Sequence, residues 1–339
     1  MNPINKIMPT LLQNKDLSIE ETEEVFEYLS SGEAKDVEMA AFLATLSMKG
    51  VSSNELVGAA KSLFPYVHNP IEQKIDTIDI VGTGGDGLKT YNISTAVAFI
   101  IASNNNICVT KHGSTAVSSK SGASDVLSEL GINISVEDKI INRCIEKSKM
   151  CFLFAPNYNK AFKNVAKVRK ELMFRTIFNL LGPLLNPARA KRQLLGVFDE
   201  KYLTTIAKAL KELGSIKSWV VHGSDGMDEI TLTGNSKVVE LNKNQINEFE
   251  IIPEKYGFKT CSINDLQGGT PKENASKILA LFKGEEGPYR DIVLLNAAAG
   301  FCVTECAKDF EEGINIAKSI IDSGKAFNTL NNLITTSNQ

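Results

Sequence analysis

The first seventy residues place hydrophobic and polar positions at helical spacing. Ser18–Glu21 and Ser52–Glu55 match the capping-box pattern that opens a helix, and apolar residues follow each of them three or four positions apart. Glu38–Lys49 carries a further amphipathic pattern. Prolines then break the helical pattern in Pro65–Pro70. The sequence therefore predicts a small helical domain over residues 1–72.

The rest of the chain alternates short apolar runs with helical stretches. Such alternation is typical of a sheet whose strands are joined by helices. We therefore expect an α/β domain over residues 73–339, with a mainly parallel central sheet flanked by helices. The runs that predict its strands are Ile78–Val81, Ile107–Thr110, Trp219–Val221 and Lys237–Leu241.

Composition agrees with a folded chain of this size. The 339 residues are 43% hydrophobic, which is enough for two domains or for one large domain with a helical appendage. The formal net charge of -3 gives no electrostatic reason to expect a nucleic-acid partner. Apolar stretches such as Ala96–Ala102 fall well short of the ~20 residues that cross a bilayer. We expect neither nucleic acid nor membrane as a partner.

Two features indicate a cytoplasmic protein. Met1–Lys6 has no apolar core of the kind found in secretion signals. The six cysteines lack the spacing of metal sites or of redox CxxC motifs, which fits reduced thiols.

The densest glycine cluster is Gly82–Gly87, which reads Gly-Thr-Gly-Gly-Asp-Gly and directly follows a predicted strand. Four glycines in six residues leave backbone N–H groups uncovered, so the loop can wrap an anion such as phosphate. It has neither the ending of a P-loop nor the spacing of a dinucleotide fingerprint. Asp86 within the loop would repel phosphate unless a cation such as Mg²⁺ lies between them. Taken alone, such a cluster favours a flexible turn.

Two further polar motifs also follow predicted strands. Lys111–Gly122 contains two lysines, five hydroxyl side chains and two glycines, which suit a polyanion. Asp228 and Glu229 offer adjacent carboxylates, which are ligands that Mg²⁺ accepts together with water and phosphate oxygens. Each motif alone is compatible with a solvated loop. Because open parallel sheets bind ligands at their strand ends, the three together predict a phosphate and magnesium site.

In order and spacing, these motifs resemble the anthranilate phosphoribosyltransferase family over almost the whole chain. The resemblance implies transfer of the 5-phosphoribosyl group from phosphoribosyl pyrophosphate to the amine of anthranilate, with release of pyrophosphate, in tryptophan biosynthesis. It also implies Mg²⁺ as cofactor, a homodimer, and a helical domain completed by helices from the middle of the chain. The segments that carry the resemblance are Gly82–Gly87, Asn92–Thr95, Lys111–Gly122, Arg175–Ala188, Gly226–Glu229 and Gly268–Pro271.

The resemblance also implies roles for individual residues. Ser94, Asp228 and Glu229 would hold Mg²⁺. Arg175 would bind the anthranilate carboxylate, a task that suits a planar fork of N–H donors. Catalysis would rest on positioning and on charge stabilisation, with Lys111 at the leaving pyrophosphate, and with His112 and Arg175 at the acceptor. The remaining substrate contacts would come from Gly82, Gly85, Asp86, Thr90, Asn92, Ile93, Ser94, Thr95, Gly113, Ser114, Ser118 and Ser119.

The acceptor half departs from the family pattern. Ser114 and Thr115 stand where the family reads Asn-Arg, and Asn159 stands where many members have histidine. The sequence therefore leaves open a phosphoribosyltransferase that acts on a different aromatic amine. A pyrimidine nucleoside phosphorylase is a further alternative, against which the intact glycine loop and the Asp228–Glu229 pair argue. A catalytically silent relative that binds nucleic acid is another, against which the acidic charge balance argues.

Overall fold

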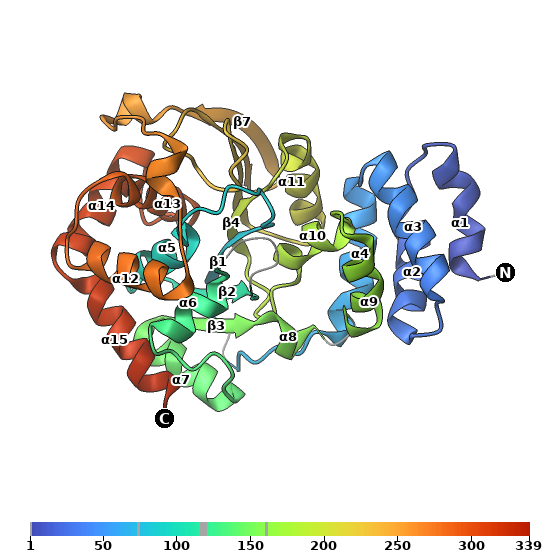
Figure 1. Cartoon of the computed structure of the whole chain (residues 1–339), viewed down its shortest axis with the longest axis horizontal. Helices are drawn as coiled ribbons and strands as arrows, with labels where there is room; N and C mark the ends of the chain where they lie inside the picture. Colours follow the sequence, from blue (N-terminus) through green and yellow to red (C-terminus); the bar gives the residue numbers. More distant parts are fainter. Residues whose placement is uncertain (1, 73–74, 116–120, 160–161) are drawn as a thin grey trace.

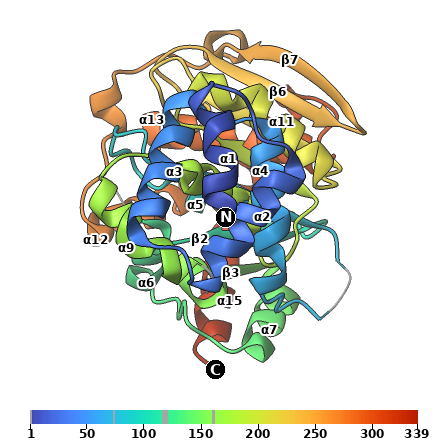
Figure 2. The same ribbon diagram turned by 90° about the vertical axis from the view of Figure 1, so that its right-hand side faces the viewer.

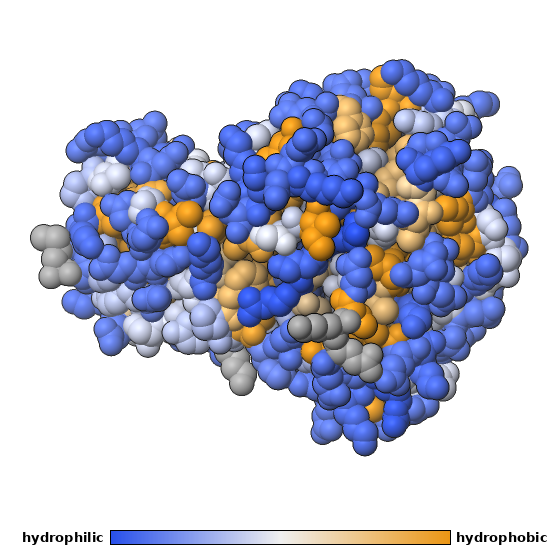
Figure 3. All heavy atoms as spheres, turned by 180° about the vertical axis from the view of Figure 1, so that it is seen from behind, coloured by the Kyte–Doolittle hydropathy of each residue, from blue (hydrophilic) through white to orange (hydrophobic). Residues whose placement is uncertain are grey.

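The computed structural model describes residues 2–72, 75–115, 121–159 and 162–339. The chain forms a small helical lobe and a larger lobe built around a sheet (Figure 1). Seen from behind, the small lobe projects from the large one as a separate knob (Figure 3). None of the described helices is both long and apolar enough to span a membrane. All six cysteines carry free thiols.

The small lobe contains the helices that the sequence predicts. Both capping boxes are formed: the Ser18 hydroxyl accepts from Glu21 N at 3.1 Å, and the Ser52 hydroxyl accepts from Glu55 N at 3.3 Å. These two predictions are confirmed. Figure 2 looks onto this lobe and shows its four helices in front of the sheet. The helices are α1 (Pro3–Leu12), α2 (Ile19–Ser31), α3 (Asp36–Lys49) and α4 (Ser53–Leu63).

Two helices from the middle of the chain lie beside these four. They are α9 (Lys163–Leu172), which contacts α2 and α3, and α10 (Ile177–Leu181), which contacts α3 and α4. Their buried side chains join the same apolar core as those of the first sixty residues. The chain leaves the lobe after the 3₁₀ turn η1 (Phe64–Tyr66) and leaves it again through η3 (Gly182–Leu185). The division at residue 72 stays a prediction.

A seven-stranded sheet in the order β3-β2-β1-β4-β5-β6-β7 forms the centre of the large lobe. The first five strands in that order pair in parallel, and the last two pairings, β5 with β6 and β6 with β7, are antiparallel, so the predicted fold class is confirmed. The four predicted runs fall on β1, β2, β5 and β6, whereas β3, β4 and β7 were not predicted. The strands are β1 (Thr77–Gly82), β2 (Cys108–Gly113), β3 (Met150–Phe154), β4 (Arg192–Gly196), β5 (Lys217–Gly223), β6 (Ser236–Asn242) and β7 (Gln245–Ile251).

Helices cover the sheet. Buried residues of α5 and α13 form one large core with residues of β1, β2 and β3. Buried residues of α11 pack with Leu195, Val220 and Val239 in a second core, which is shared with the small lobe. The two lobes therefore meet across a continuous apolar interior. The helices of the large lobe are α5 (Ile93–Ala102), α6 (Ala123–Glu129), α7 (Asp138–Ser148), α8 (Ala155–Tyr158), α11 (Leu203–Glu212), α12 (Pro271–Phe282), α13 (Pro288–Val303), α14 (Phe310–Asp322) and α15 (Lys325–Ser337).

Candidate active site

The glycine loop and the Asp228 turn meet at the ends of two paired strands. Gly82 on β1 pairs with Gly196 on β4, and Asp228 lies against both glycines. A β-carbon on Gly82 would come within 2.3 Å of Asp228 Oδ2. Gly84 N donates a hydrogen bond of 2.6 Å to the same oxygen. The fold thus joins two motifs that the sequence analysis placed together, and it adds Gly196, which had not been singled out.

The start of α5 and the end of β2 complete this cluster. Ser94 N donates to Glu229 Oε1 at 2.9 Å, as expected for a carboxylate near a helix N-terminus. Lys111 Nζ donates to the Ser94 hydroxyl at 3.2 Å and to the Ile80 carbonyl at 2.6 Å. Lys111 is buried. Its ammonium group is therefore held by protein oxygens, one of which is the hydroxyl of Ser94.

Burial strongly perturbs the charges of this cluster. Burial, and then the nearby charge of Asp86, raise the pKa of Asp228 to about 7. Burial, and then Asp228, raise the pKa of Glu229 well above its ordinary range. Burial lowers the pKa of Lys111 to about 8, although Asp79 and both carboxylates oppose that shift. Half-buried carboxylates that repel one another in this way are stabilised by added positive charge, so the residues fit a divalent cation.

The number of protein ligands suits magnesium. In the ranges that the structure covers, no group of three or more His, Cys, Asp or Glu residues could hold a metal by itself. Mg²⁺ is commonly bound through one or two carboxylates, with water and substrate phosphate oxygens completing its shell. Ser94, Asp228 and Glu229 would leave room for such oxygens.

The other predicted donor-side residues connect the glycine loop to the rest of the large lobe. Asp86 Oδ1 accepts from Leu88 N at 3.1 Å, and Thr90 forms a bridge with Gln267. The Asn92 side chain accepts from Asn274 Nδ2 at 2.8 Å and donates to the Ser121 carbonyl at 3.3 Å. The structure thus adds Asn274 to the surroundings of the loop, a residue that no motif had indicated.

Two predicted substrate contacts lie in the interior. The side chains of Ile93 and Thr95 are buried, and the Thr95 hydroxyl is not hydrogen-bonded to any residue that the structure describes. These side chains do not reach the surface. A contact with substrate would therefore have to use backbone groups at the start of α5. Ser118 and Ser119 lie outside the described residues.

His112, at the end of β2, is buried and neutral. Burial, and then Lys111, lower the pKa of His112 to about 4, while a hydrogen bond with the Gly182 backbone opposes the shift. Its Nε2 lies 3.4 Å from Asn159 Nδ2. The next residue, Gly113, ends β2, and the Ser114 carbonyl accepts from Ser124 N at 3.4 Å. The predicted acceptor residues therefore lie next to the predicted phosphate-binding cluster, because His112 directly follows Lys111 on β2.

Arg175 links the crossing between the lobes to the glycine loop. Its guanidinium donates to the Gly85 carbonyl and lies 4.2 Å from the centre of the Phe198 ring. The Ser47 hydroxyl on α3 donates to the Arg175 carbonyl at 3.3 Å. Arg175 itself is exposed, so its fork of donors is accessible at the edge of the loop.

A glycine cradle beside two half-buried carboxylates, at the strand ends of a parallel sheet with a helical lobe, is typical of an enzyme that handles a phosphorylated substrate. Comparison with known proteins narrows this class. Residues 5–64 match the helical bundle domain of a glycosyl transferase family, and residues 74–327 match its a/b domain.

The chain belongs to the anthranilate phosphoribosyltransferase family. It is 46% identical to anthranilate phosphoribosyltransferase of Clostridium kluyveri over 96% of each chain. The crystal structure of the Thermus thermophilus enzyme has a TM-score of 0.92, with 36% identity over 100% of both chains. The Saccharomyces cerevisiae enzyme in complex with PRPP and Mg has a TM-score of 0.88, with 26% identity, covering 99% of this chain and 98% of that one.

Proposed function

We propose that the protein is a Mg²⁺-dependent anthranilate phosphoribosyltransferase of tryptophan biosynthesis. It transfers the 5-phosphoribosyl group from phosphoribosyl pyrophosphate to the amine of anthranilate and releases pyrophosphate. The observation that carries this proposal is the convergence of the glycine loop, Ser94, Lys111 and the Asp228–Glu229 pair, within a chain that matches the family over nearly its full length.

Ser94, Asp228 and Glu229 are the proposed magnesium ligands. When bound, the ion would neutralise charge on the pyrophosphate as it leaves the sugar. The yeast relative in complex with PRPP and Mg supports this use of the metal. N–H groups of the glycine loop would hold phosphate oxygens beside the metal. Lys111, which is bonded to the Ser94 hydroxyl, would contribute a positive charge near the leaving pyrophosphate.

On the acceptor side, Arg175 would bind the carboxylate of anthranilate and His112 would orient its ring. The aromatic amine is neutral at pH 7, so it attacks the anomeric carbon with its own lone pair. The bond from that carbon to pyrophosphate breaks, and the amine then loses a proton. The neutral state of His112 suits a residue that positions the acceptor without adding charge. The protein thus contributes chiefly placement and electrostatic stabilisation.

A second candidate is the same reaction on a different aromatic amine. It is favoured by Ser114, Thr115 and Asn159, all on the acceptor side. Asn159 is 7% exposed, and its Oδ1 has no hydrogen-bond partner among the described residues. A buried acceptor atom without a partner is costly and is typical of a site that a ligand completes.

The test is a steady-state assay with phosphoribosyl pyrophosphate, Mg²⁺ and anthranilate that follows the loss of anthranilate fluorescence. We expect turnover that a chelator abolishes. Donor binding without turnover of anthranilate would favour the second candidate. In that event Ser114→Asn separates the cases, because it should tighten anthranilate binding if the usual contact is merely weakened, and should reduce activity if the pocket serves another amine.

Asp228→Asn tests the metal site. We expect it to weaken Mg²⁺-dependent use of the donor far more than it weakens folding. The matched control is Asp225→Asn in the same turn, because the Asp225 carboxylate accepts from its neighbours Met227 N, Thr231 and Thr233. Equal Mg²⁺ dependence in parent and Asp228→Asn would remove Asp228 from the metal site.

We also propose a homodimer formed through the small lobe. Leu12 on α1 is 68% exposed, and on α3 Val37 is 72% and Met48 is 82% exposed. Large apolar side chains gathered on one lobe are typical of an interface. Light scattering on the purified protein should give twice the chain mass of 37.0 kDa. A measured mass equal to that of one chain, at micromolar protein concentration, would contradict the proposal.

A further inference from the structure

A buried carboxylate, Asp79, lies in the middle of β1. It is fully buried between the apolar residues Ile78 and Ile80. Both of its oxygens accept hydrogen bonds: Oδ1 accepts from His112 N at 3.1 Å, and Oδ2 accepts from Asn186 Nδ2 at 2.7 Å. No role in binding donor, acceptor or metal accounts for a charge at this position.

The other hydrogen bonds of the Asn186 side chain fix the orientation of its amide group. Asn186 Nδ2 also donates to the Thr110 carbonyl at 2.7 Å, and Asn186 Oδ1 accepts from Ala188 N at 2.8 Å. Turning the amide over would break both of these bonds. Asp79 must therefore accept on both oxygens, which suits the ionised carboxylate.

These contacts connect three parts of the candidate site. Asp79 lies three residues before the glycine loop, His112 is the next-to-last residue of β2, and Asn186 directly follows η3 in the segment that begins with Arg175. We propose that Asp79 is a positioning residue that fixes His112 and the Arg175–Asn186 segment relative to the donor loop, and so aligns the acceptor with the sugar. This inference rests on the proposed function.

The energetic cost of the residue argues against a packing role alone. An apolar side chain would fill a site inside a sheet without the penalty of a buried charge. Burial raises the pKa of Asp79 to about 6, and the Asn186 hydrogen bond and the charge of Lys111 only partly offset that shift. A carboxylate kept at this cost is consistent with a requirement for its two fixed acceptor atoms.

Kinetics of Asp79→Asn give the first test. His112 N and Asn186 Nδ2 both donate to Asp79. The new amide has only one acceptor atom, so its NH₂ group would face one of these two donors and displace it. We expect kcat/KM for anthranilate to fall about 10²-fold, as small misplacements can cause. Affinity for the donor with Mg²⁺ should fall less than this, because Asp79 acts on the donor side only through its charge near Lys111, whereas its hydrogen bonds go to His112 and Asn186.

A control variant makes this test specific. Thr329→Val is the control for a lost buried hydrogen bond, since the Thr329 hydroxyl bonds Ser103 at the far end of α5. A loss in Asp79→Asn that Thr329→Val reproduces, or one that affects donor and acceptor alike, would overturn the inference.

A spectroscopic readout is independent of turnover. The chain has three histidines, so ¹⁵N-histidine labelling gives three backbone amide signals. In the parent protein the His112 amide signal should titrate with the ionisation of Asp79, near pH 6, and this change should vanish in Asp79→Asn. A His112 amide signal that is the same in the parent and in Asp79→Asn across this pH range would refute the contact and the inference with it. Absence of turnover in the parent would refute the proposed function instead, while the titration would still decide the contact.

Discussion

Gly196 lies directly against the backbone of Asp228. A β-carbon at position 196 would come within 1.4 Å of the Asp228 carbonyl oxygen, a separation that no side chain can occupy. Gly196 pairs with Gly82 across β4 and β1, and both glycines border the same aspartate. The position of Asp228, a proposed metal ligand, therefore depends on glycine at both positions, because a side chain at either one would collide with the aspartate.

Gly196→Ala should displace the Asp228–Glu229 turn. We expect loss of Mg²⁺-dependent turnover and a fall in stability of about 1–3 kcal/mol, as overpacking typically causes. The control is Gly300→Ala, whose β-carbon would meet the movable end of Ile101 at 2.8 Å. It should lower stability without changing the Mg²⁺ dependence. Turnover assays across Mg²⁺ concentrations, with urea unfolding, check both; normal Mg²⁺ dependence in Gly196→Ala would refute the expectation.

Arg175→Lys should impair acceptor use. Lysine lacks the planar fork that donates to the Gly85 carbonyl while lying over Phe198. We expect kcat/KM for anthranilate to drop about 10²-fold, with a smaller effect on the donor. Arg143→Lys is the control, because Arg143 is remote in sequence and donates to the Gln339 side chain at the end of the chain. Equal kinetics in the Arg175 and Arg143 variants would remove Arg175 from the acceptor site.

His112 should stay neutral across the working pH range. Its pKa is lowered to about 4, chiefly by burial. Between pH 4 and 6.5, His112 is therefore protonated in the unfolded chain but not in the folded chain. Stability should therefore be lost as pH falls from 6.5, by up to about 3 kcal/mol at pH 4 from this group.

Asp79 acts in the opposite direction. Its pKa is raised to about 6, so its contribution to stability grows as pH falls from 6 towards 3.8. Urea unfolding of the parent and of His112→Gln at several pH values isolates the histidine term. A parent and a variant with identical pH slopes would contradict the neutral, buried state of His112.

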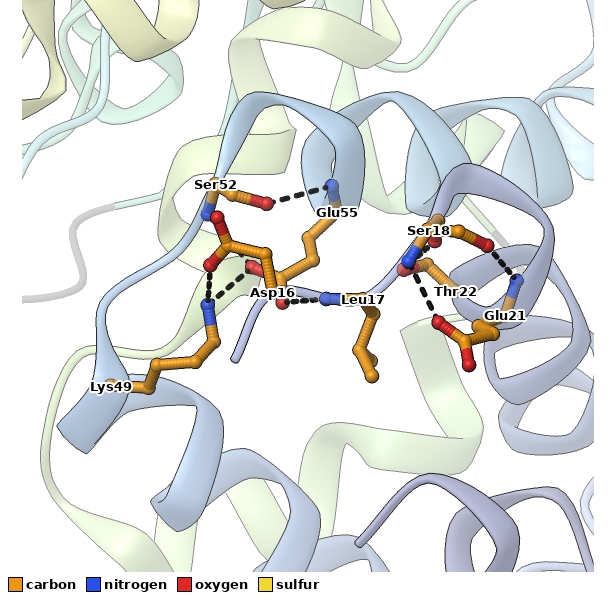
Figure 4. Close-up of polar contacts among 8 residues, drawn as sticks. All are labelled: Asp16, Leu17, Ser18, Glu21, Thr22, Lys49, Ser52 and Glu55. Carbon is orange, nitrogen blue, oxygen red and sulfur yellow. Dashed lines mark hydrogen bonds and ion pairs between the residues drawn. The ribbon is translucent and has the colours of Figure 1, made fainter. Parts of the chain in front are cut away.

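Glu55→Gln should destabilise the small lobe. Figure 4 shows the buried Glu55 carboxylate accepting from Leu17 N, Ser52 N and Lys49 Nζ, at 3.0, 2.7 and 3.1 Å. Glutamine cannot accept at both ends and leaves Lys49 with the exposed Asp16 as its remaining ion-pair partner among the described residues. We expect a loss of about 3 kcal/mol, measured by urea unfolding.

Glu21→Gln is the matched control, because Glu21 serves the same capping-box role on α2 without a buried lysine. Glutamine also serves in a capping box, so the cost should stay below about 1 kcal/mol. Equal losses in the Glu55 and Glu21 variants would show that the buried ion pair adds nothing to the cap.

Features that arise from neighbouring residues in the chain could be predicted from local sequence patterns. Ser18 and Ser52 open helices because their hydroxyls cap the N–H groups three residues later, within a single turn. The glycine loop and the Asp228–Glu229 pair were recognised because each follows a run of β-forming residues, and sheets of this kind bind ligands at strand ends. Family resemblance then joined these motifs into one candidate site.

The residues that surround that site became apparent from the fold. Gly196, Asn274 and Asp79 belong to none of the motifs that carry the resemblance, and their partners lie tens to more than a hundred residues away along the chain. The short strand β4, which was not predicted, pairs with β1 and thereby brings Gly196 to Asp228. Strand order, register and close approach arise from packing between distant segments, and the local spacing of hydrophobic and polar residues carries no record of them.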